Sequence, residues 1–131
     1  MDAVRVLVVD DNSDTTDSLG LLLRLWGHKP LAARGGTEAL AAASDFQPDV
    51  ALLDIGMPRM DGFELARRLR DLPGLGDLTL LAMTGYADAD YRRRTEEAGF
   101  LAHLAKPADP AELEALLGVL AREKAQHACA T

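Results

Sequence analysis

Two runs of consecutive apolar residues, at positions 6–9 and 50–53, each lead directly into aspartate. Asp10 and Asp11 follow the first run, and Asp54 follows the second. An unbroken apolar run of this length is typical of a strand that is buried on both faces, as in a parallel sheet. Because an unpaired buried carboxylate strongly disfavours folding, acids at the ends of buried strands indicate a cation site or chemistry.

The remainder of the chain alternates between strand-like and helix-like segments. The apolar patterns predict strands at 4–9, 29–33, 50–53, 78–83 and 100–104, with a helix after each of them. Asn12, Ser13 or Asp14 is expected to cap the first helix, and Gly27 to end it. The helix at 88–98 has only a thin apolar face, which predicts weak packing.

Five strand–helix units predict an α/β fold, with a doubly wound parallel sheet and helices on both faces. We expect one domain over residues 1–124, because the sequence has no internal repeat and no linker. Residues 125–131 carry no apolar pattern and are predicted to form a disordered tail. Whether such a chain acts as a single domain or belongs to a larger protein is left open.

Composition excludes several classes of function. A net charge of -7 argues against direct binding to nucleic acid, whose phosphates favour clustered lysine and arginine. No apolar stretch approaches the roughly 20 residues that span a bilayer, and the amino-terminal segment does not resemble a signal peptide. Cys129, the single cysteine, cannot form an internal disulfide. These features predict a cytoplasmic protein without a membrane association.

Polar residues with chemical potential fall at or just beyond four of the predicted strand ends. They are Asp10, Asp11, Asp54, Thr84 and Lys106. In a parallel sheet the carboxyl ends of the strands meet along one edge, where binding sites of open α/β folds lie. The sequence therefore predicts that these side chains converge on one site.

The motifs around these residues resemble the receiver domain of two-component response regulators, over essentially the whole chain. The matching segments are Val8-Val9-Asp10-Asp11-Asn12, Leu53-Asp54-Ile55-Gly56-Met57-Pro58, Met60-Asp61-Gly62, Met83-Thr84-Gly85 and Ala105-Lys106-Pro107. The resemblance implies a flavodoxin-like sheet of strand order 2-1-3-4-5, the order of a chemotaxis regulator in this family. It also implies a cytoplasmic phosphoprotein that takes part in a phosphorelay.

The resemblance assigns each site residue a role. Asp54 would accept a phosphoryl group from the phosphohistidine of a sensor histidine kinase or a histidine phosphotransfer protein. Asp10, Asp11, Asp54 and the backbone carbonyl of Gly56 would hold Mg2+ or Mn2+, a hard cation that prefers oxygen ligands. Lys106 and Thr84 would contact the transferred phosphoryl group. The domain would assist its own phosphorylation and its slow dephosphorylation without being an enzyme for another substrate.

The resemblance also implies a switch and an output face. Thr84 would move toward the phosphate, and His103 would take the position of the aromatic switch residue. An exposed histidine at the end of a strand, without a switch role, explains His103 equally well. The output face would comprise the helix at 88–98, the last strand and the last helix, in a monomer or a phosphorylation-dependent dimer. A cis Lys106–Pro107 bond is also implied. Gly56 and Tyr86 would affect the phosphoaspartate lifetime in opposite directions, so no lifetime is predicted.

Three alternative functions compete with that of a phosphorylated receiver domain. Aspartyl-phosphate phosphohydrolases carry an Asp-x-Asp motif, whereas the acids of this chain are adjacent. A flavodoxin-type cofactor site needs a hydroxyl- and amide-rich loop in place of Asp10 and Asp11, which would repel a phosphate. The third is a receiver-fold interaction module that signals without phosphorylation. Such modules usually lack an acid or the lysine, and this chain retains both.

Overall fold

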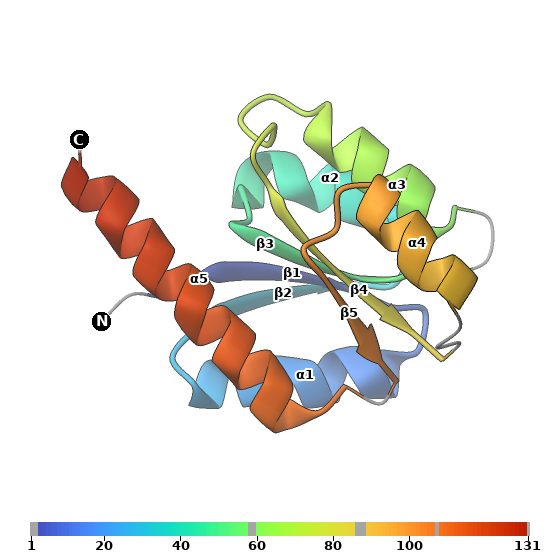
Figure 1. Cartoon of the computed structure of the whole chain (residues 1–131), viewed down its shortest axis with the longest axis horizontal. Coiled ribbons are helices and arrows are strands. Elements are labelled where there is room, and N and C mark those ends of the chain that lie inside the picture. Colours follow the sequence, from blue (N-terminus) through green and yellow to red (C-terminus); the bar gives the residue numbers. More distant parts are fainter. Residues whose placement is uncertain (1–2, 58–59, 86–88, 107, 131) are drawn as a thin grey trace.

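Five parallel strands form one sheet in the order β2-β1-β3-β4-β5 in the computed structural model, which confirms the predicted fold class and strand order (Figure 1). The structure describes residues 3–57, 60–85, 89–106 and 108–130. The strands are β1 (Arg5–Val9), β2 (Lys29–Ala33), β3 (Val50–Asp54), β4 (Thr79–Thr84) and β5 (Ala102–Ala105). The helices are α1 (Ser13–Leu25), α2 (Gly36–Phe46), α3 (Gly62–Arg70), α4 (Ala89–Glu97) and α5 (Pro110–Ala130).

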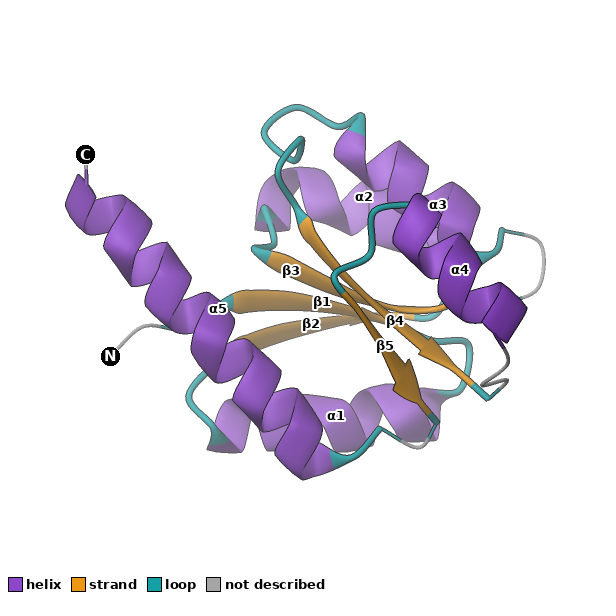
Figure 2. Ribbon diagram, viewed as in Figure 1, coloured by secondary structure: helices purple, strands orange, loops and turns teal. Residues whose placement is uncertain are grey.

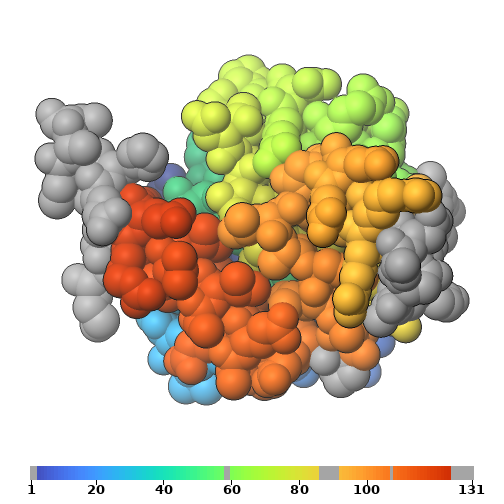
Figure 3. All heavy atoms as spheres, in the orientation of Figure 1, coloured from blue at the N-terminus to red at the C-terminus, as the bar shows by residue number. Residues whose placement is uncertain are grey.

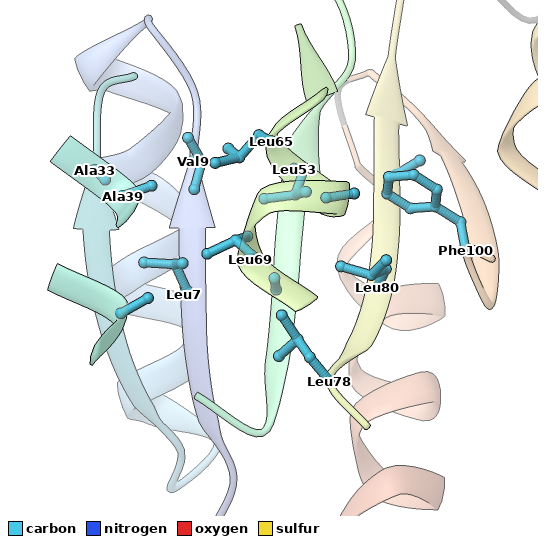
Figure 4. Close-up of a cluster of buried hydrophobic side chains, with 14 of the residues drawn as sticks. Leu7, Val9, Ala33, Ala39, Leu53, Leu65, Leu69, Leu78, Leu80 and Phe100 are labelled. Carbon is cyan, nitrogen blue, oxygen red and sulfur yellow. The ribbon is translucent and has the colours of Figure 1, made fainter. Parts of the chain in front are cut away.

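Helices lie on both faces of the sheet, so each central strand supplies side chains to two cores (Figure 2). Leu7 and Leu53 belong to a cluster that packs beneath α2 and α3, together with Leu65 and Leu69 (Figure 4). The neighbouring residues of the same strands, such as Leu52, point to the opposite cluster under α1 and α5. This division follows from the alternation of side chains along a strand and explains why the apolar runs are continuous.

The α4 helix, β5 and the described part of α5 lie on one face of the molecule (Figure 3). Thr95 is the buried residue among the α4 side chains that the structure describes, and its hydroxyl donates a hydrogen bond to the Arg92 carbonyl within the helix. The apolar contribution of these side chains to the core is therefore small.

Several element boundaries differ from the sequence prediction by one residue or more. Asn12 is the one of the three cap candidates that caps α1: its side-chain oxygen accepts a hydrogen bond of 2.9 Å from the Asp14 N–H, because the helix begins at Ser13. The last strand begins at Ala102 rather than 100. Phe100 turns its ring into the core instead, while its N–H closes the end of α4 on the Thr95 carbonyl.

The α5 helix also continues to Ala130, through residues for which the sequence predicts a disordered tail. Residues 125–130 contain three alanines and one glutamine. Both residue types favour helix even without an apolar stripe. The domain limit at residue 124 stays a prediction.

His28, which follows α1, contacts Val4, the residue before β1, and this contact predicts a pH effect on stability. Its Nδ1 accepts a hydrogen bond of 3.2 Å from the Val4 N–H, which requires this nitrogen to be unprotonated. Burial lowers the pKa of His28, against the opposing effect of the Glu114 carboxylate. Below a pH of about 6.5, the ordinary value for histidine, the unfolded chain therefore binds this proton more readily than the folded chain does.

We accordingly expect the free energy of unfolding to fall as pH drops below about 6.5, until folded His28 is protonated as well. Urea unfolding of the wild type and His28→Asn at several pH values in this range measures the effect. The slope of the unfolding free energy against pH should be smaller in the variant. His127→Asn is the matched control. Equal slopes in the wild type and His28→Asn would exclude this role for His28.

Candidate functional site

Backbone hydrogen bonds hold the carboxyl ends of the strands together. The Asp10 N–H donates to the Ala33 carbonyl at 3.1 Å, and the Lys106 N–H donates to the Thr84 carbonyl at 2.9 Å. The Ile55 N–H, next to Asp54, donates to the β4 backbone at 2.9 Å. The ends of β1, β3, β4 and β5 therefore have fixed positions along one edge, as predicted.

Three carboxylates converge at this edge. One ligand oxygen from each of Asp10, Asp11 and Asp54 lies within 4.8 Å of the other two. Asp10 is fully buried and Asp54 is only 6% exposed, whereas Asp11 is exposed. The cluster is thus shielded by the protein on one side and reached by solvent on the other.

Lys106 places its ammonium between the two buried acids. Its Nζ lies 2.6 Å from Oδ2 of Asp10 and 3.0 Å from Oδ2 of Asp54. The contact with Asp54 is a charge-assisted hydrogen bond, the stronger class of hydrogen bond in proteins, whereas the contact with Asp10 is an ion pair without hydrogen-bond geometry. One positive charge therefore offsets part of the repulsion among three carboxylates.

The other oxygen of each buried carboxylate accepts a backbone N–H two residues further along the chain. Asp10 Oδ1 accepts from Asn12 at 2.9 Å, and Asp54 Oδ1 accepts from Gly56 at 3.0 Å. These short turns fix the rotation of both carboxylates, because each is held from two directions. The side chains are therefore oriented before any ligand or substrate binds.

The electrostatics of the cluster follow from burial and from these contacts. Burial raises the pKa of Asp54, aided by the Asp10 carboxylate and opposed by Lys106 and the Gly56 N–H. Burial by itself would lower the pKa of Lys106, but its contacts with the Asp10 and Asp54 carboxylates and their negative charge outweigh burial and raise that pKa. Lys106 therefore keeps its charge at neutral pH.

The donor set fits a divalent metal ion. Three carboxylates and one lysine leave an excess of negative charge at the site, and hard cations such as Mg2+ favour carboxylate oxygens. The exposure of Asp11 leaves room for water, several molecules of which Mg2+ usually retains.

Thr84 and His103 lie on the same face of the sheet. In the parallel register Thr84 pairs with Ala105, and His103 pairs with Ala82, two positions earlier on both strands. Thr84 is buried and His103 is half-buried. His103 lines a small cavity together with Arg92 of α4, so this face of the sheet is the one toward α4.

Two predicted features lie outside the described residues: Tyr86, and the peptide bond between Lys106 and Pro107. One positioning residue was missed. The Gly62 N–H donates to the Ile55 carbonyl at 3.2 Å, and a Cβ at Gly62 would lie 2.9 Å from the Asp54 carbonyl oxygen. The start of α3 therefore packs directly on the backbone of Asp54. Its place in the Asp61-Gly62 motif was the available signal.

Residues 6–118 match the family described as the response regulator receiver domain, and the chain belongs to this family. With its acidic pocket and lysine it is a phosphoacceptor module of two-component signalling, which implies a sensor kinase as partner. Among the described residues, none of the helices combines the length and apolar character needed to cross a membrane.

Relatives with this domain include both short and longer proteins. An uncharacterised 14.6 kDa protein of Leptolyngbya boryana is 41% identical over 108 residues, which cover 82% of each chain. The transcriptional regulatory protein PrrA of Mycobacterium tuberculosis is 39% identical over 124 residues, 95% of this chain and 52% of PrrA. The chain thus spans about half the length of that relative.

Solved structures give the same assignment. The chemotaxis protein CheY4 of Vibrio cholerae is 28% identical with a TM-score of 0.84, covering 90% of this chain and 98% of that one. The receiver domain of sensor histidine kinase PA1611 from Pseudomonas aeruginosa is 27% identical with a TM-score of 0.80, covering 91% and 98%. That structure has a magnesium ion coordinated in its active-site cleft.

Proposed function

We propose that Asp54 is the phosphoacceptor of this receiver domain. The observation that carries the proposal is the position of Lys106, whose Nζ lies between Asp54 and Asp10 within a cluster of three carboxylates. An aspartate that attacks a phosphoryl group must approach another anion, so it requires positive charge close to both. Asp54 has this charge beside it and is held in one orientation by the Gly56 N–H.

The donor is the phosphohistidine of a sensor histidine kinase or a histidine phosphotransfer protein. An Asp54 carboxylate oxygen attacks phosphorus, the new P–O bond forms as the P–N bond breaks, and the electron pair of that bond returns to the imidazole nitrogen. Lys106 stabilises the phosphoryl oxygens as a point charge, and the Thr84 hydroxyl donates to them after transfer. Positioning and electrostatics supply the catalysis, as in phosphoryl transfer generally.

Mg2+, or Mn2+ in its place, would be held by Asp10, Asp11, Asp54 and the carbonyl of Gly56. When bound, such a cation neutralises charge on the carboxylates and on the transferred group. The same residues assist the slow return reaction, in which water attacks phosphorus and releases phosphate from Asp54. The domain therefore promotes its own phosphorylation and dephosphorylation and acts on no other substrate.

The output face consists of α4, β5 and α5, which lie on one side of the molecule (Figure 3). Thr84 and His103 connect it to the acceptor, since they share the sheet face toward α4. Phosphorylation draws Thr84 toward Asp54 and lets His103 change its rotamer, which alters the surface offered to a downstream protein target. The receiver unit spans residues 1–124 and acts as a monomer or as a dimer formed on phosphorylation.

Intact-mass spectrometry after incubation with acetyl phosphate, with Mg2+ or with EDTA, tests the acceptor and metal roles. We expect a gain of one phosphoryl group with Mg2+ and little or none with EDTA. If no gain occurs with acetyl phosphate, a phosphorylated histidine kinase is used as donor. Failure with both donors would contradict the proposal and favour a module that signals without phosphorylation.

A further inference from the structure

A groove of about 360 Å3 lies between α3 and α4, two helices that run side by side at the surface (Figures 1 and 2). Its lining residues are Phe63, Ala66, Arg67, Arg70, Asp71 and Ala98. The acidic cluster and Lys106 take no part in this lining. The groove is therefore separate from the acceptor site.

An aromatic side chain forms the apolar part of the groove. Phe63 is half-buried, and its ring meets the Phe100 ring edge-on, with centroids 6.1 Å apart and an interplanar angle of 85°. The Arg94 guanidinium of α4 lies 4.4 Å from the centroid of the Phe63 ring. Phe63 of α3 is thus contacted by Arg94 of α4 and by Phe100, which lies between α4 and β5. Aromatic residues and arginine are among the types most enriched at binding interfaces.

The charge around the groove is opposite to that of the whole protein. The chain has a net charge of -7, yet α3 and α4 together carry six of its 14 basic residues and only four acids. The six are Arg67, Arg68, Arg70, Arg92, Arg93 and Arg94. This pair of helices is therefore a positive region on an acidic molecule.

The arginines at the groove are held in different ways. Arg67 pairs with Glu64 at 2.8 Å on the α3 surface and is 64% exposed, so most of its side chain remains accessible. The Arg70 guanidinium donates to the carbonyl oxygens of Leu78 and Gly99, at 3.0 and 3.2 Å. Carbonyl dipoles fix Arg70 without cancelling its charge, and only Asp71 adds a negative charge to the lining.

We propose that this groove docks an acidic segment of a protein partner, with an apolar side chain placed against Phe63 and carboxylates facing Arg67 and Arg70. Charge complementarity selects this occupant, because opposite charges across an interface favour encounter and exclude partners of like charge. The surface lies on α3 and α4 and extends the contacts available to a partner beyond the output face. Its use does not require phosphorylation of Asp54.

An NMR titration with a defined peptide tests the proposal. The probe is a blocked hexapeptide in which Leu-Phe is flanked on each side by two glutamates, and the comparison peptide has glutamine in place of every glutamate. We expect the acidic peptide to bind with millimolar affinity and to shift the amide resonances of residues 63–71 and 92–99. Its affinity should fall at higher salt. Shifts elsewhere, or equal binding of the glutamine peptide, would overturn the proposal.

Variants locate the charge that matters. We expect Arg67→Gln to weaken binding of the acidic peptide about two- to fivefold, the effect of losing one exposed charge pair. Arg122→Gln on α5 is the matched control, with the same change in net charge, and should bind as the wild type does. Equal weakening by both variants would show a long-range charge effect and would refute a docking site in the groove.

Two further comparisons distinguish this inference from its competitors. Asp54→Asn should bind the peptide as the wild type does. Peptide binding therefore tests the groove independently of whether Asp54 accepts a phosphoryl group. Shifts of the same amides on raising the protein concentration, without peptide, would identify a second copy as the occupant and overturn a separate acidic partner.

Discussion

Asp54→Asn should abolish the Mg2+-dependent gain of one phosphoryl group while leaving the fold intact. The substitution keeps the volume of the side chain and its ability to accept the Gly56 N–H, but it replaces the nucleophilic carboxylate with an amide. Asp54 is almost completely buried in the cluster, so no other side chain can take over its exact position. Intact-mass spectrometry after acetyl phosphate treatment measures the effect, with circular dichroism as a check of folding.

The control for this variant is Asp17→Asn, an exposed acid on α1 whose replacement gives the same change in charge. It should be phosphorylated as the wild type is. A full phosphoryl gain in Asp54→Asn would place the acceptor elsewhere and remove the basis of the proposed mechanism. Peptide mapping of the phosphorylated wild type would then identify the residue that carries the group.

The sheet and its acidic edge could be predicted because both depend on local patterns. The continuous apolar runs before Asp10 and Asp54 define strands buried on two faces, and parallel strands must end at a common edge. Residue type then restricts the chemistry, since carboxylates at such an edge suit a cation. These inferences need no knowledge of which side chains touch.

The contacts within the site could not be predicted in this way. Lys106 and Asp54 are separated by 52 positions in the sequence, and the 3.0 Å contact between them arises from the packing of the strands that carry them. The same holds for the position of Gly62 against the Asp54 backbone. Sequence patterns specify the edge on which a residue lies, whereas tertiary packing determines its distance to a partner.

The groove between α3 and α4 could not be predicted from the sequence either. The sequence indicates that 92–94 form a basic run on a helix, which a solvated surface would explain equally well. The contact of Arg94 with Phe63 depends on how two helices from different strand–helix units pack together. A charge pattern acquires functional meaning only when its neighbours in space are known.

Lys106→Ala should destabilise the protein in the absence of Mg2+, because it leaves the Asp10 and Asp54 carboxylates without the ammonium between them. Loss of one partner from a fully buried ion pair costs about 3–5 kcal/mol. Lys106 is 26% exposed, so solvent screens part of the effect and we expect a loss of about 1–3 kcal/mol. Urea unfolding measures this loss, and added Mg2+ should stabilise the variant more than the wild type.

Lys124→Ala is the matched control, since Lys124 pairs with Asp49 at 2.9 Å but is 43% exposed and lies outside the acidic cluster. Its unfolding should respond to Mg2+ as the wild type does. Lys106→Ala should still accept some phosphoryl group on Asp54, more slowly, but without the change in amide exchange of α4 and β5 that we expect when the wild type is phosphorylated. If phosphorylated Lys106→Ala shows the same change in amide exchange as the wild type, the lysine balances charge in the cluster without transmitting the phosphorylation signal.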